Sequence, residues 1–181
     1  AIRALLGREL PRVAGGHPGT LLQTSDLEKQ KALVAALASS YLVIQGPPGT
    51  GKTWTGARLL VSLIASGQRV GIAATSHKAI NNFLTAVEEV AADANVAFSG
   101  LKKGSGDDAF GGRFVRDTDD NEECETAEWE VIAGTAWLFA REKMDQRLDY
   151  LFVDEAGQVA LADAVAMGTA ARNLVLLGDP Q

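Results

Sequence analysis

The sequence contains a single cysteine and few aromatic side chains. Cys124 has no second cysteine with which to form an internal disulfide, which fits a reducing compartment. Aromatic residues make up only 6% of the chain. No apolar run approaches the ~18 residues that a membrane-spanning helix needs, and the opening AIRALLGREL lacks the apolar stretch of a secretory signal. We therefore expect an intracellular protein without a membrane partner.

Acidic residues outnumber basic ones, and the excess of negative charge lies in one segment of the chain. The formal net charge is −6, but residues 107–130 alone carry ten acidic and two basic side chains, which leaves +2 for the rest. An acidic chain argues at first against nucleic acid as a partner. The near-neutral remainder can nevertheless bind phosphates locally, without a broad basic face. The length of 181 residues and the hydrophobic fraction of 46% fit one globular domain.

Short apolar runs alternate with amphipathic segments along most of the chain. This alternation predicts an α/β fold, with a mostly parallel sheet that is flanked by helices on both faces. The runs predict strands at 41–45, 69–75, 96–100, 129–135, 150–155 and 173–178. The amphipathic segments predict helices from 26, at 52–65, at 77–94 and at 159–167.

Two segments fall outside this alternation. Residues 1–25 are mixed and loop-like, so we expect a lead-in segment there and a domain from 26 to 181. Residues 101–128 are rich in glycine, then strongly acidic, with few apolar residues. We interpret them as a surface insertion, partly disordered. A partner site or a flexible loop in place of an accessory domain are the alternatives to a solvated surface.

The glycine-rich stretch GPPGTGKT at 46–53 lies between a predicted strand and a predicted helix. Its spacing is that of a phosphate-binding loop, in which glycines let backbone N–H groups turn toward phosphate oxygens. The candidate nucleotide contacts are Gly46, Pro47, Pro48, Gly49, Thr50, Gly51, Lys52, Thr53 and Thr55. Lys52 reaches the β- and γ-phosphates in such loops, and the Thr53 hydroxyl binds Mg²⁺. We expect Trp54 and Ala57 to pack in the core.

An acidic pair follows the predicted strand at 150–155, about a hundred residues after the glycine-rich loop. In phosphate-loop hydrolases a carboxylate at this position holds Mg²⁺, and a second one accepts a proton from the attacking water. Asp154 is the metal candidate and Glu155 the candidate base. Alone, an acidic turn is more often only solvated. Together with the loop at 46–53, the pair predicts a Mg²⁺-dependent nucleoside triphosphate hydrolase.

Three motifs in this order, IQGPPGTGKT, DEAGQ and LLGDPQ, resemble the first RecA-like domain of superfamily 1 helicases. The form DEAGQ is most similar to the subgroup that contains the nonsense-mediated mRNA decay helicase and the flap-processing nuclease-helicases. The resemblance covers residues 26–181. It implies a RecA-like P-loop fold, ATP and Mg²⁺ as cofactors, and single-stranded RNA or DNA as partner. It also implies a place in the cytoplasm, nucleoid or nucleus.

The resemblance assigns roles to further residues. Gln30 takes the place of an adenine-reading glutamine, and a solvent-facing helix position is its alternative. Gln158 matches the glutamine that positions the γ-phosphate or attacking water. Gln181, beside Asp179, matches the residue that senses the γ-phosphate and couples it to nucleic acid. The segments ATSHKAINNFL and AGTAWLF are similar to two nucleic-acid motifs, whose implied contacts are Thr75, Ser76, His77, Lys78, Asn81 and Thr135.

Three alternatives stay open. His77 can instead be a helix-capping or surface histidine, and Trp137 is expected in the core more than on a nucleobase. The chain can be a motor domain that works with a second RecA-like domain after residue 181, poorly active alone, or a stand-alone nucleotide-binding switch. An AAA+-type remodelling ATPase is disfavoured, because its sensor strand usually ends in a polar residue rather than in the GDPQ that stands at 178–181.

Overall fold

A single parallel sheet forms the centre of the computed structural model, which describes residues 1–16, 22–47 and 49–179. Its strands are β1 (Tyr41–Gln45), β2 (Val70–Ala73), β3 (Gly100–Lys103), β4 (Val115–Thr118), β5 (Val131–Gly134), β6 (Leu148–Val153) and β7 (Ala171–Gly178). They form a seven-stranded sheet in the order β1-β7-β6-β2-β5-β3-β4. Every neighbouring pair runs parallel.

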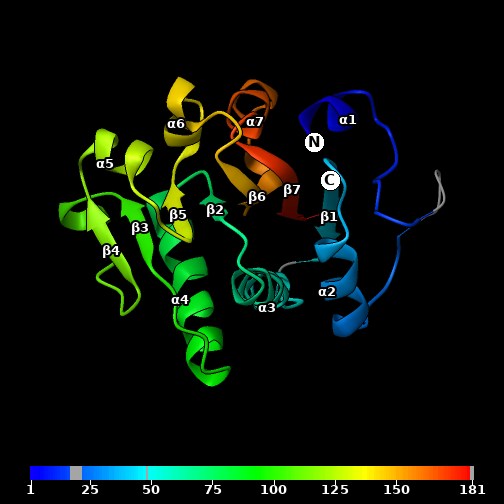
Figure 1. Ribbon diagram of the computed structural model, residues 1–181, viewed down its shortest axis with the longest axis horizontal. Coiled ribbons are helices and arrows are strands. Elements are labelled where there is room, and N and C mark those ends of the chain that lie inside the picture. Colours follow the sequence, from blue (N-terminus) through cyan, green and yellow to red (C-terminus); the bar gives the residue numbers. More distant parts are fainter. Residues whose placement is uncertain (17–21, 48, 180–181) are drawn as a thin grey trace.

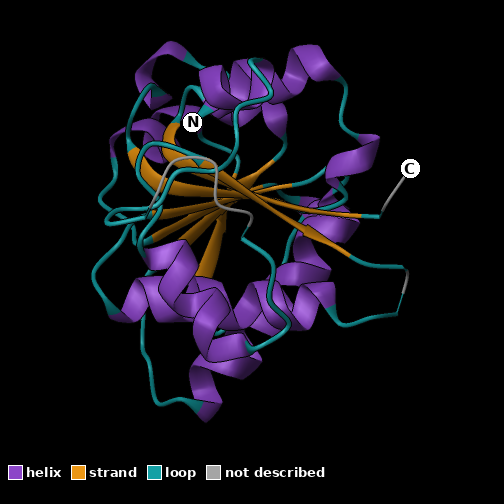
Figure 2. Ribbon diagram, turned by 90° about the vertical axis from the view of Figure 1, so that its right-hand side faces the viewer, coloured by secondary structure: helices purple, strands orange, loops and turns teal. Residues whose placement is uncertain are grey.

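Helices cover both faces of this sheet. They are α1 (Ile2–Leu6), α2 (Leu27–Ala35), α3 (Lys52–Ala65), α4 (His77–Asp93), α5 (Asn121–Thr126), α6 (Ala136–Phe139) and α7 (Leu161–Gly168). Short 3₁₀ turns are η1 (Gly106–Asp108), η2 (Glu142–Met144) and η3 (Ala156–Gln158). In Figure 1, α2, α3 and α4 lie below the sheet, and α1, α6 and α7 lie above it. Figure 2 shows the same three layers from the side.

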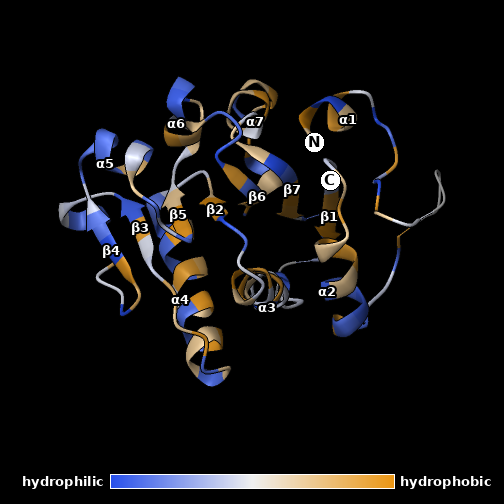
Figure 3. Ribbon diagram, in the orientation of Figure 1, coloured by the Kyte–Doolittle hydropathy of each residue, from blue (hydrophilic) through white to orange (hydrophobic). Residues whose placement is uncertain are grey.

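Each face of the sheet has its own apolar cluster. On the side of α3 and α4, Leu59, Leu60 and Phe83 are fully buried, and the ring of Phe83 lies 6.2 Å from that of Phe152 on β6. On the opposite side, Phe139 of α6 packs among the apolar residues of α7 and β6. Figure 3 shows hydrophobic residues on β1 and β2 and hydrophilic ones over β4 and α5.

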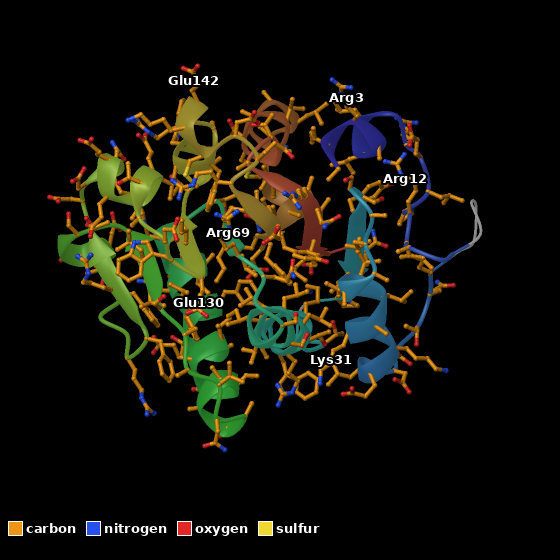
Figure 4. The ribbon with its side chains drawn as sticks, in the orientation of Figure 1. Arg3, Arg12, Lys31, Arg69, Glu130 and Glu142 are labelled. Carbon is orange, nitrogen blue, oxygen red and sulfur yellow. The ribbon has the colours of Figure 1, made fainter. Side chains whose placement is uncertain are left out.

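Charged side chains on the outer side of this architecture point into solvent. Figure 4 shows Glu142 at the tip of η2 and Arg3 on α1 directed away from the fold. Glu130 is different, because its carboxylate accepts hydrogen bonds from the backbone N–H of Ser99 at 2.7 Å and from its hydroxyl at 3.1 Å. It thereby ties the start of β5 to the segment before β3.

Most elements match the sequence predictions. The helix expected at 52–65 is α3, and the helix expected at 77–94 is α4 with Ser76 as its N-cap. The helix expected from 26 is α2, whose N-cap Asp26 accepts a hydrogen bond from the backbone N–H of Lys29 at 2.9 Å. The α/β fold with a parallel sheet flanked by helices is confirmed. The short helix α1 lies within the lead-in segment, where no helix was expected.

The segment at 101–128 differs most from its expectation of a surface insertion. The third strand lies at Gly100–Lys103 rather than at 96–100, and the same segment supplies β4 and α5. Strand β3 lies inside the sheet, between β5 and β4, and Leu101 and Lys102 are fully buried. This part of the chain is therefore built into the sheet, because its polar strands find partners on α4 and on each other.

Two carboxylates fasten the connection between β3 and β4. Glu88 on α4 accepts hydrogen bonds from three successive backbone N–H groups, those of residues 113, 114 and 115, at 2.7–3.1 Å. Asp117 on β4 accepts from the backbone N–H groups of Phe110 and Gly111 at 2.9 and 2.8 Å. Because parallel strands start at the same end, this connection has to return along the sheet, and these bonds hold it in place.

Removing the Glu88 carboxylate should therefore loosen the β3–β4 end of the sheet. We expect Glu88→Ala to lower the free energy of unfolding by about 2 kcal/mol, because hydrogen bonds to charged groups contribute roughly 1.5–3 kcal/mol. Urea denaturation of the purified chain measures the change. The neighbouring Glu89 is exposed, so Glu89→Ala is the matched control. Equal midpoints for the two variants would contradict this account of the segment.

Candidate nucleotide-binding site and nucleic-acid interface

The parallel arrangement brings the candidate residues to one edge of the sheet. The glycine-rich loop follows β1, Asp179 follows β7, and the acidic pair follows β6, and these three strands are neighbours. Thr75 follows the next strand, β2, and Thr135 follows β5 beside it. Ligands of open α/β sheets bind outside this carboxyl edge. The sheet order therefore brings the nucleotide candidates next to the nucleic-acid candidates.

The backbone of the glycine-rich loop takes conformations that favour glycine. Gly49 and Gly51 have φ values of +80° and +82°, and Gly51 is the N-cap of α3. The hydroxyl of Thr50 donates a hydrogen bond to the carbonyl oxygen of Pro47 at 2.7 Å, which tightens the turn. The loop thus leads directly into the N-terminus of a fourteen-residue helix, where backbone N–H groups and the helix dipole favour an anion.

Lys52 lies at the centre of this loop and is held by three oxygen atoms. Its ammonium group donates to the carbonyl oxygens of Gly46 and Pro47 at 2.7 and 3.0 Å. It also pairs with the carboxylate of Asp179 at 2.5 Å. The side chain of Lys52 is 15% exposed and that of Asp179 is 51% exposed. The lysine is therefore already positioned at the loop, with a carboxylate in the role of an anionic partner.

A cleft of about 310 Å³ opens between the loop and the acidic pair. It is lined by Lys52, Thr53, Ala79, Asn82, Asp154, Glu155, Gly157, Gln158, Leu177, Gly178 and Asp179. The cleft brings together the candidate lysine, the candidate metal ligands, the candidate base and Gln158. Asn82 was not among the predicted residues. It lies one position after Asn81 on α4, and the pattern of the helix alone did not indicate which of the two faces the cleft.

Asp154 and Glu155 have different surroundings. Burial raises the pKa of the Asp154 carboxyl above its usual range, and the charges of Glu155 and Asp179 add to this rise. The backbone N–H of Glu155, which donates to Asp154 at 2.9 Å, and the charge of Lys52 oppose it. Glu155 has a left-handed backbone with φ of +53°. Such strain in a residue other than glycine is characteristic of functional positions.

The hydroxyl of Thr75 donates a hydrogen bond to the Glu155 carboxylate at 3.0 Å. This bond joins the candidate base to the first candidate contact of the predicted nucleic-acid motif. Ser76 caps α4 and accepts from the backbone N–H of Ala79 at 3.2 Å. Lys78 is exposed on the first turn of α4, and Thr135 is the half-buried N-cap of α6. Thr75 is thus the point at which the two predicted sites meet.

His77 and Asn81 face another part of the chain. A ring nitrogen of His77 lies 3.8 Å from the carboxylate of Asp108, and the side-chain amide of Asn81 donates to the carbonyl oxygen of Ala109 at 3.1 Å. Both contacts are with the connection between β3 and β4. Neither contact is visible in the sequence, because the partners lie 25 or more positions away.

Gln30 lies apart from the cleft, in a second hollow of about 400 Å³ beside β1. This hollow is also lined by Thr24 and by Gln45, the residue immediately before the glycine-rich loop. The Gln30 amide donates to the carbonyl oxygen of Thr24 at 2.9 Å. Its position beside the entry to the loop is compatible with a contact to a nucleobase.

Core packing was expected for Trp54, Ala57 and Trp137. Ala57 is fully buried as expected, but Trp54 is 51% exposed and Trp137 is 82% exposed, so the expectation of core packing is wrong for both tryptophans. Trp54 lies on the outer side of α3, where the guanidinium of Arg58 stacks 3.5 Å from its ring centre. Helix α6 buries Leu138 and turns Trp137 outward.

The candidates Pro48 and Gln181 lie outside the described residues.

A family model described as AAA domain matches residues 27–181. The chain belongs to the AAA domain family. Membership of this family implies use of a nucleotide, in agreement with the cleft at the glycine-rich loop. Across the described parts of the chain, no helix is long and apolar enough to cross a membrane.

Curated relatives of this AAA domain include two helicase/nucleases and a DNA-binding protein. "DNA replication ATP-dependent helicase/nuclease DNA2" of Gallus gallus is 24% identical over 160 residues, which cover 85% of this chain and 16% of the relative. The protein of the same name from Saccharomyces cerevisiae is 23% identical, with 86% of this chain and 11% of the relative covered. "DNA-binding protein SMUBP-2" of Mus musculus is 36% identical over 86 residues, covering 46% of this chain and 9% of the relative. The chain thus spans a small part of these relatives.

Solved structures with the same fold include a helicase and a restriction-modification enzyme. The UvsW helicase from bacteriophage T4 has a TM-score of 0.52 at 13% identity, and the match covers 98% of this chain and 58% of that one. The Type ISP restriction-modification enzyme LlaGI has a TM-score of 0.55 at 14% identity, over 87% of this chain and 17% of that one. These two structures confirm the RecA-like fold, and the family model together with the helicase relatives supports the superfamily 1 helicase type.

The raised pKa of Asp154 makes a prediction about stability. The folded state holds this proton more tightly than the unfolded state, so the ionised carboxylate opposes folding above its folded pKa. Below its unfolded pKa of ~3.9 the group is protonated in both states and has no such effect. We expect Asp154→Asn to raise the melting temperature at pH 7, with a gain that vanishes toward pH 4.

Thermal denaturation at both pH values measures the Asp154→Asn effect. Asp145 is exposed, so Asp145→Asn controls for the loss of one negative charge. A lower melting temperature of Asp154→Asn at pH 7 would show that the ionised carboxylate is stabilising instead.

Proposed function

We propose that this chain is the ATP-binding motor domain of a nucleic-acid helicase or translocase. It would hydrolyse ATP with Mg²⁺ and use the cycle to move on single-stranded RNA or DNA. The observation that carries this proposal is the hydrogen bond between Thr75 and Glu155, because it connects a nucleotide cleft with a nucleic-acid motif. We also propose that it acts inside the cell, where its nucleic-acid substrate is.

Several features support ATP as the ligand of the cleft. The backbone of residues 49–51 and the N-terminus of α3 suit phosphate oxygens. Lys52 already binds a carboxylate there, and a γ-phosphate is a stronger anionic partner. Gln30 can donate to and accept from an adenine edge with its amide. Gln158 lines the cleft and would orient the attacking water or the γ-phosphate.

The residues of the cleft also suit Mg²⁺. Thr53 and Asp154 offer oxygen atoms, the ligands that Mg²⁺ prefers, and would hold it together with phosphate oxygens and water. When bound, the metal would neutralise charge on the β- and γ-phosphates. Asp154 is half-buried and feels the negative charges of Glu155 and Asp179, whose repulsion a bound cation would relieve. Within the described residues no group of three or more acidic, histidine or cysteine side chains could hold a metal alone.

Glu155 is our candidate for the general base. Its carboxylate lines the cleft and can accept the proton of an attacking water. The hydrogen bond from Thr75 engages one of its oxygens. A phosphate of nucleic acid that takes Thr75 as its donor would release this oxygen. This exchange would make hydrolysis depend on nucleic acid.

The parent protein would need parts beyond these residues. We propose a second RecA-like domain that contributes an arginine to the γ-phosphate, since such residues contribute roughly 10³–10⁵ in turnover in phosphoryl transfer. The 181-residue chain alone would therefore bind ATP weakly and hydrolyse it slowly. The short coverage of the relatives supports this proposal.

Substitutions in the cleft test the proposed function. We expect Lys52→Ala to weaken binding of a fluorescent ATP analogue in MgCl₂ by roughly 10- to 100-fold, because it removes a charged hydrogen-bond donor. Glu155→Gln should bind the analogue normally and slow hydrolysis by about 10²-fold or more. Lys143 lies 63% exposed against Glu125, so Lys143→Ala serves as the control. Equal binding by Lys52→Ala and the control would overturn the nucleotide site.

Thr75 offers a test of the proposed coupling. Thr75→Val keeps the shape of the side chain and removes the hydroxyl that holds Glu155. We expect the rate of ATP hydrolysis without nucleic acid to rise a few-fold, and the stimulation by single-stranded nucleic acid to fall. Thr75→Ser, which keeps the hydroxyl, should behave like the unchanged chain. A fall of the rate to that of Glu155→Gln would show that Thr75 positions the base rather than restrains it.

A further inference from the structure

A second acidic feature lies beside the predicted nucleic-acid motif. The acidic loop, residues 104–111, follows β3 at the same sheet edge as Thr75 and Thr135. Its sequence GSGDDAFG contains two carboxylates, Asp107 and Asp108, and no basic residue. Both aspartates are exposed. A negatively charged loop thus lies where a polyanion is expected to bind.

Two residues that the sequence assigns to nucleic acid are engaged by this loop. The carboxylate of Asp108 lies 3.8 Å from a ring nitrogen of His77, whose side chain is only 26% exposed. The amide of Asn81 donates to the carbonyl oxygen of Ala109 at 3.1 Å. The carbonyl oxygen of the Asn81 side chain is buried without a hydrogen-bond partner. Neither His77 nor Asn81 is therefore free to receive a phosphate in this arrangement.

The backbone of the acidic loop is held by buried groups, whereas the side chain of Asp108 is largely exposed. The fully buried ammonium group of Lys102 donates to the carbonyl oxygen of Asp108 and lies 3.8 Å from the carboxylate of Asp117. Asp117 in turn accepts from the backbone N–H groups of Phe110 and Gly111. By contrast, the side chain of Asp108 is 59% exposed. A rotation of this side chain can uncover the ring nitrogen of His77 that faces it, while the backbone contacts of the loop stay in place and the other ring nitrogen stays 3.4 Å from the Lys102 ammonium group.

We propose that the acidic loop is an electrostatic gate on the nucleic-acid track, in which the Asp108 carboxylate takes the place of a backbone phosphate beside His77. Asn81 is then the latch of this gate rather than a contact to nucleic acid. The proposal rests on the proposed function and deepens it, because it names a competitor for the same site. Phosphodiester backbone, of DNA or RNA, is the chemistry that displaces Asp108.

Charge explains why only a tightly binding strand would displace Asp108. The N-terminus of α4 attracts an anion, and the Asp108 carboxylate lies 3.8 Å from the ring of His77, the first residue of that helix. An incoming strand must replace one carboxylate and approach the other, Asp107. Only a strand that also engages the exposed donors Thr75 and Lys78 offers enough contacts in exchange. Polyanions that are short or bind weakly do not displace Asp108 and are excluded from the nucleic-acid track.

Removal of the charge at Asp108 should tighten binding. The repulsion between two unit charges about 4 Å apart in water, here the Asp108 carboxylate and a backbone phosphate, changes an affinity roughly fivefold. We therefore expect Asp108→Asn to bind fluorescein-labelled dT20 and U20 roughly fivefold more tightly than the unchanged chain, measured by fluorescence anisotropy at fixed salt. Asp119 lies in the same acidic segment and is exposed, so Asp119→Asn is the matched control for net charge. A misfolded variant could not gain affinity.

The two possible roles of Asn81 predict opposite changes in affinity. If Asn81 is the latch that holds the loop, Asn81→Ala frees the loop and tightens binding of both oligonucleotides. If Asn81 contacts nucleic acid directly, Asn81→Ala weakens binding. Because its side-chain oxygen has no partner, the variant loses a single hydrogen bond and should fold. Weaker binding by Asn81→Ala would overturn its role as a latch.

The outcomes separate the gate from the function on which it rests. Tighter binding by Asp108→Asn, with no gain for Asp119→Asn, supports the gate, and a difference between dT20 and U20 identifies the strand it admits. Equal affinity of Asp108→Asn, Asp119→Asn and the unchanged chain overturns the gate alone. Failure of every variant to bind either oligonucleotide, with ATP binding retained, overturns the nucleic-acid function and the gate with it.

Discussion

The parallel register of the sheet is the constraint on which the rest of the structure depends. Because all neighbouring strands run in one direction, every loop at their carboxyl ends opens on the same edge. The order β1-β7-β6-β2-β5-β3 then decides which loops are neighbours. It brings the glycine-rich loop, Asp179 and the acidic pair together on one side. Thr75, Thr135 and the acidic loop lie on the other, and the bond between Thr75 and Glu155 crosses the boundary.

Local signals account for the parts of the fold that could be predicted. Helix α3 begins at Lys52 because the glycines before it stop the strand and supply its N-cap, and both features are written in adjacent residues. Strands β3 and β4 have no such signal. Their sequences GLKK and VRDT are polar, and they become strands because Lys102 and Asp117 pair across them and Glu88 on α4 holds the connection. These partners are distant in sequence, so composition pointed to the surface.

The candidate site divides in the same way. The residues of 46–53 and the acidic pair could be selected from spacing alone, since their geometry depends on strand ends and a helix start. The orientation of His77 and Asn81 could not, because it depends on a loop that follows another strand. The exposed positions of Trp54 and Trp137 were also missed. Large apolar side chains usually favour the core, and only the packing of α3 and α6 decides which side of each helix faces solvent.

The pair between Lys52 and Asp179 has a consequence for how nucleotide affinity should be understood. Before a nucleotide binds, the ammonium group of Lys52 already has partners in the same chain, two carbonyl oxygens and the carboxylate of Asp179. In the proposed nucleotide site, a triphosphate would have to displace Asp179 from Lys52. Its apparent dissociation constant would then exceed the intrinsic one by the inverse of the fraction of molecules in which the pair is open. The proposed site would thus carry a built-in threshold for nucleotide concentration, which the position of Asp179 after β7 would adjust.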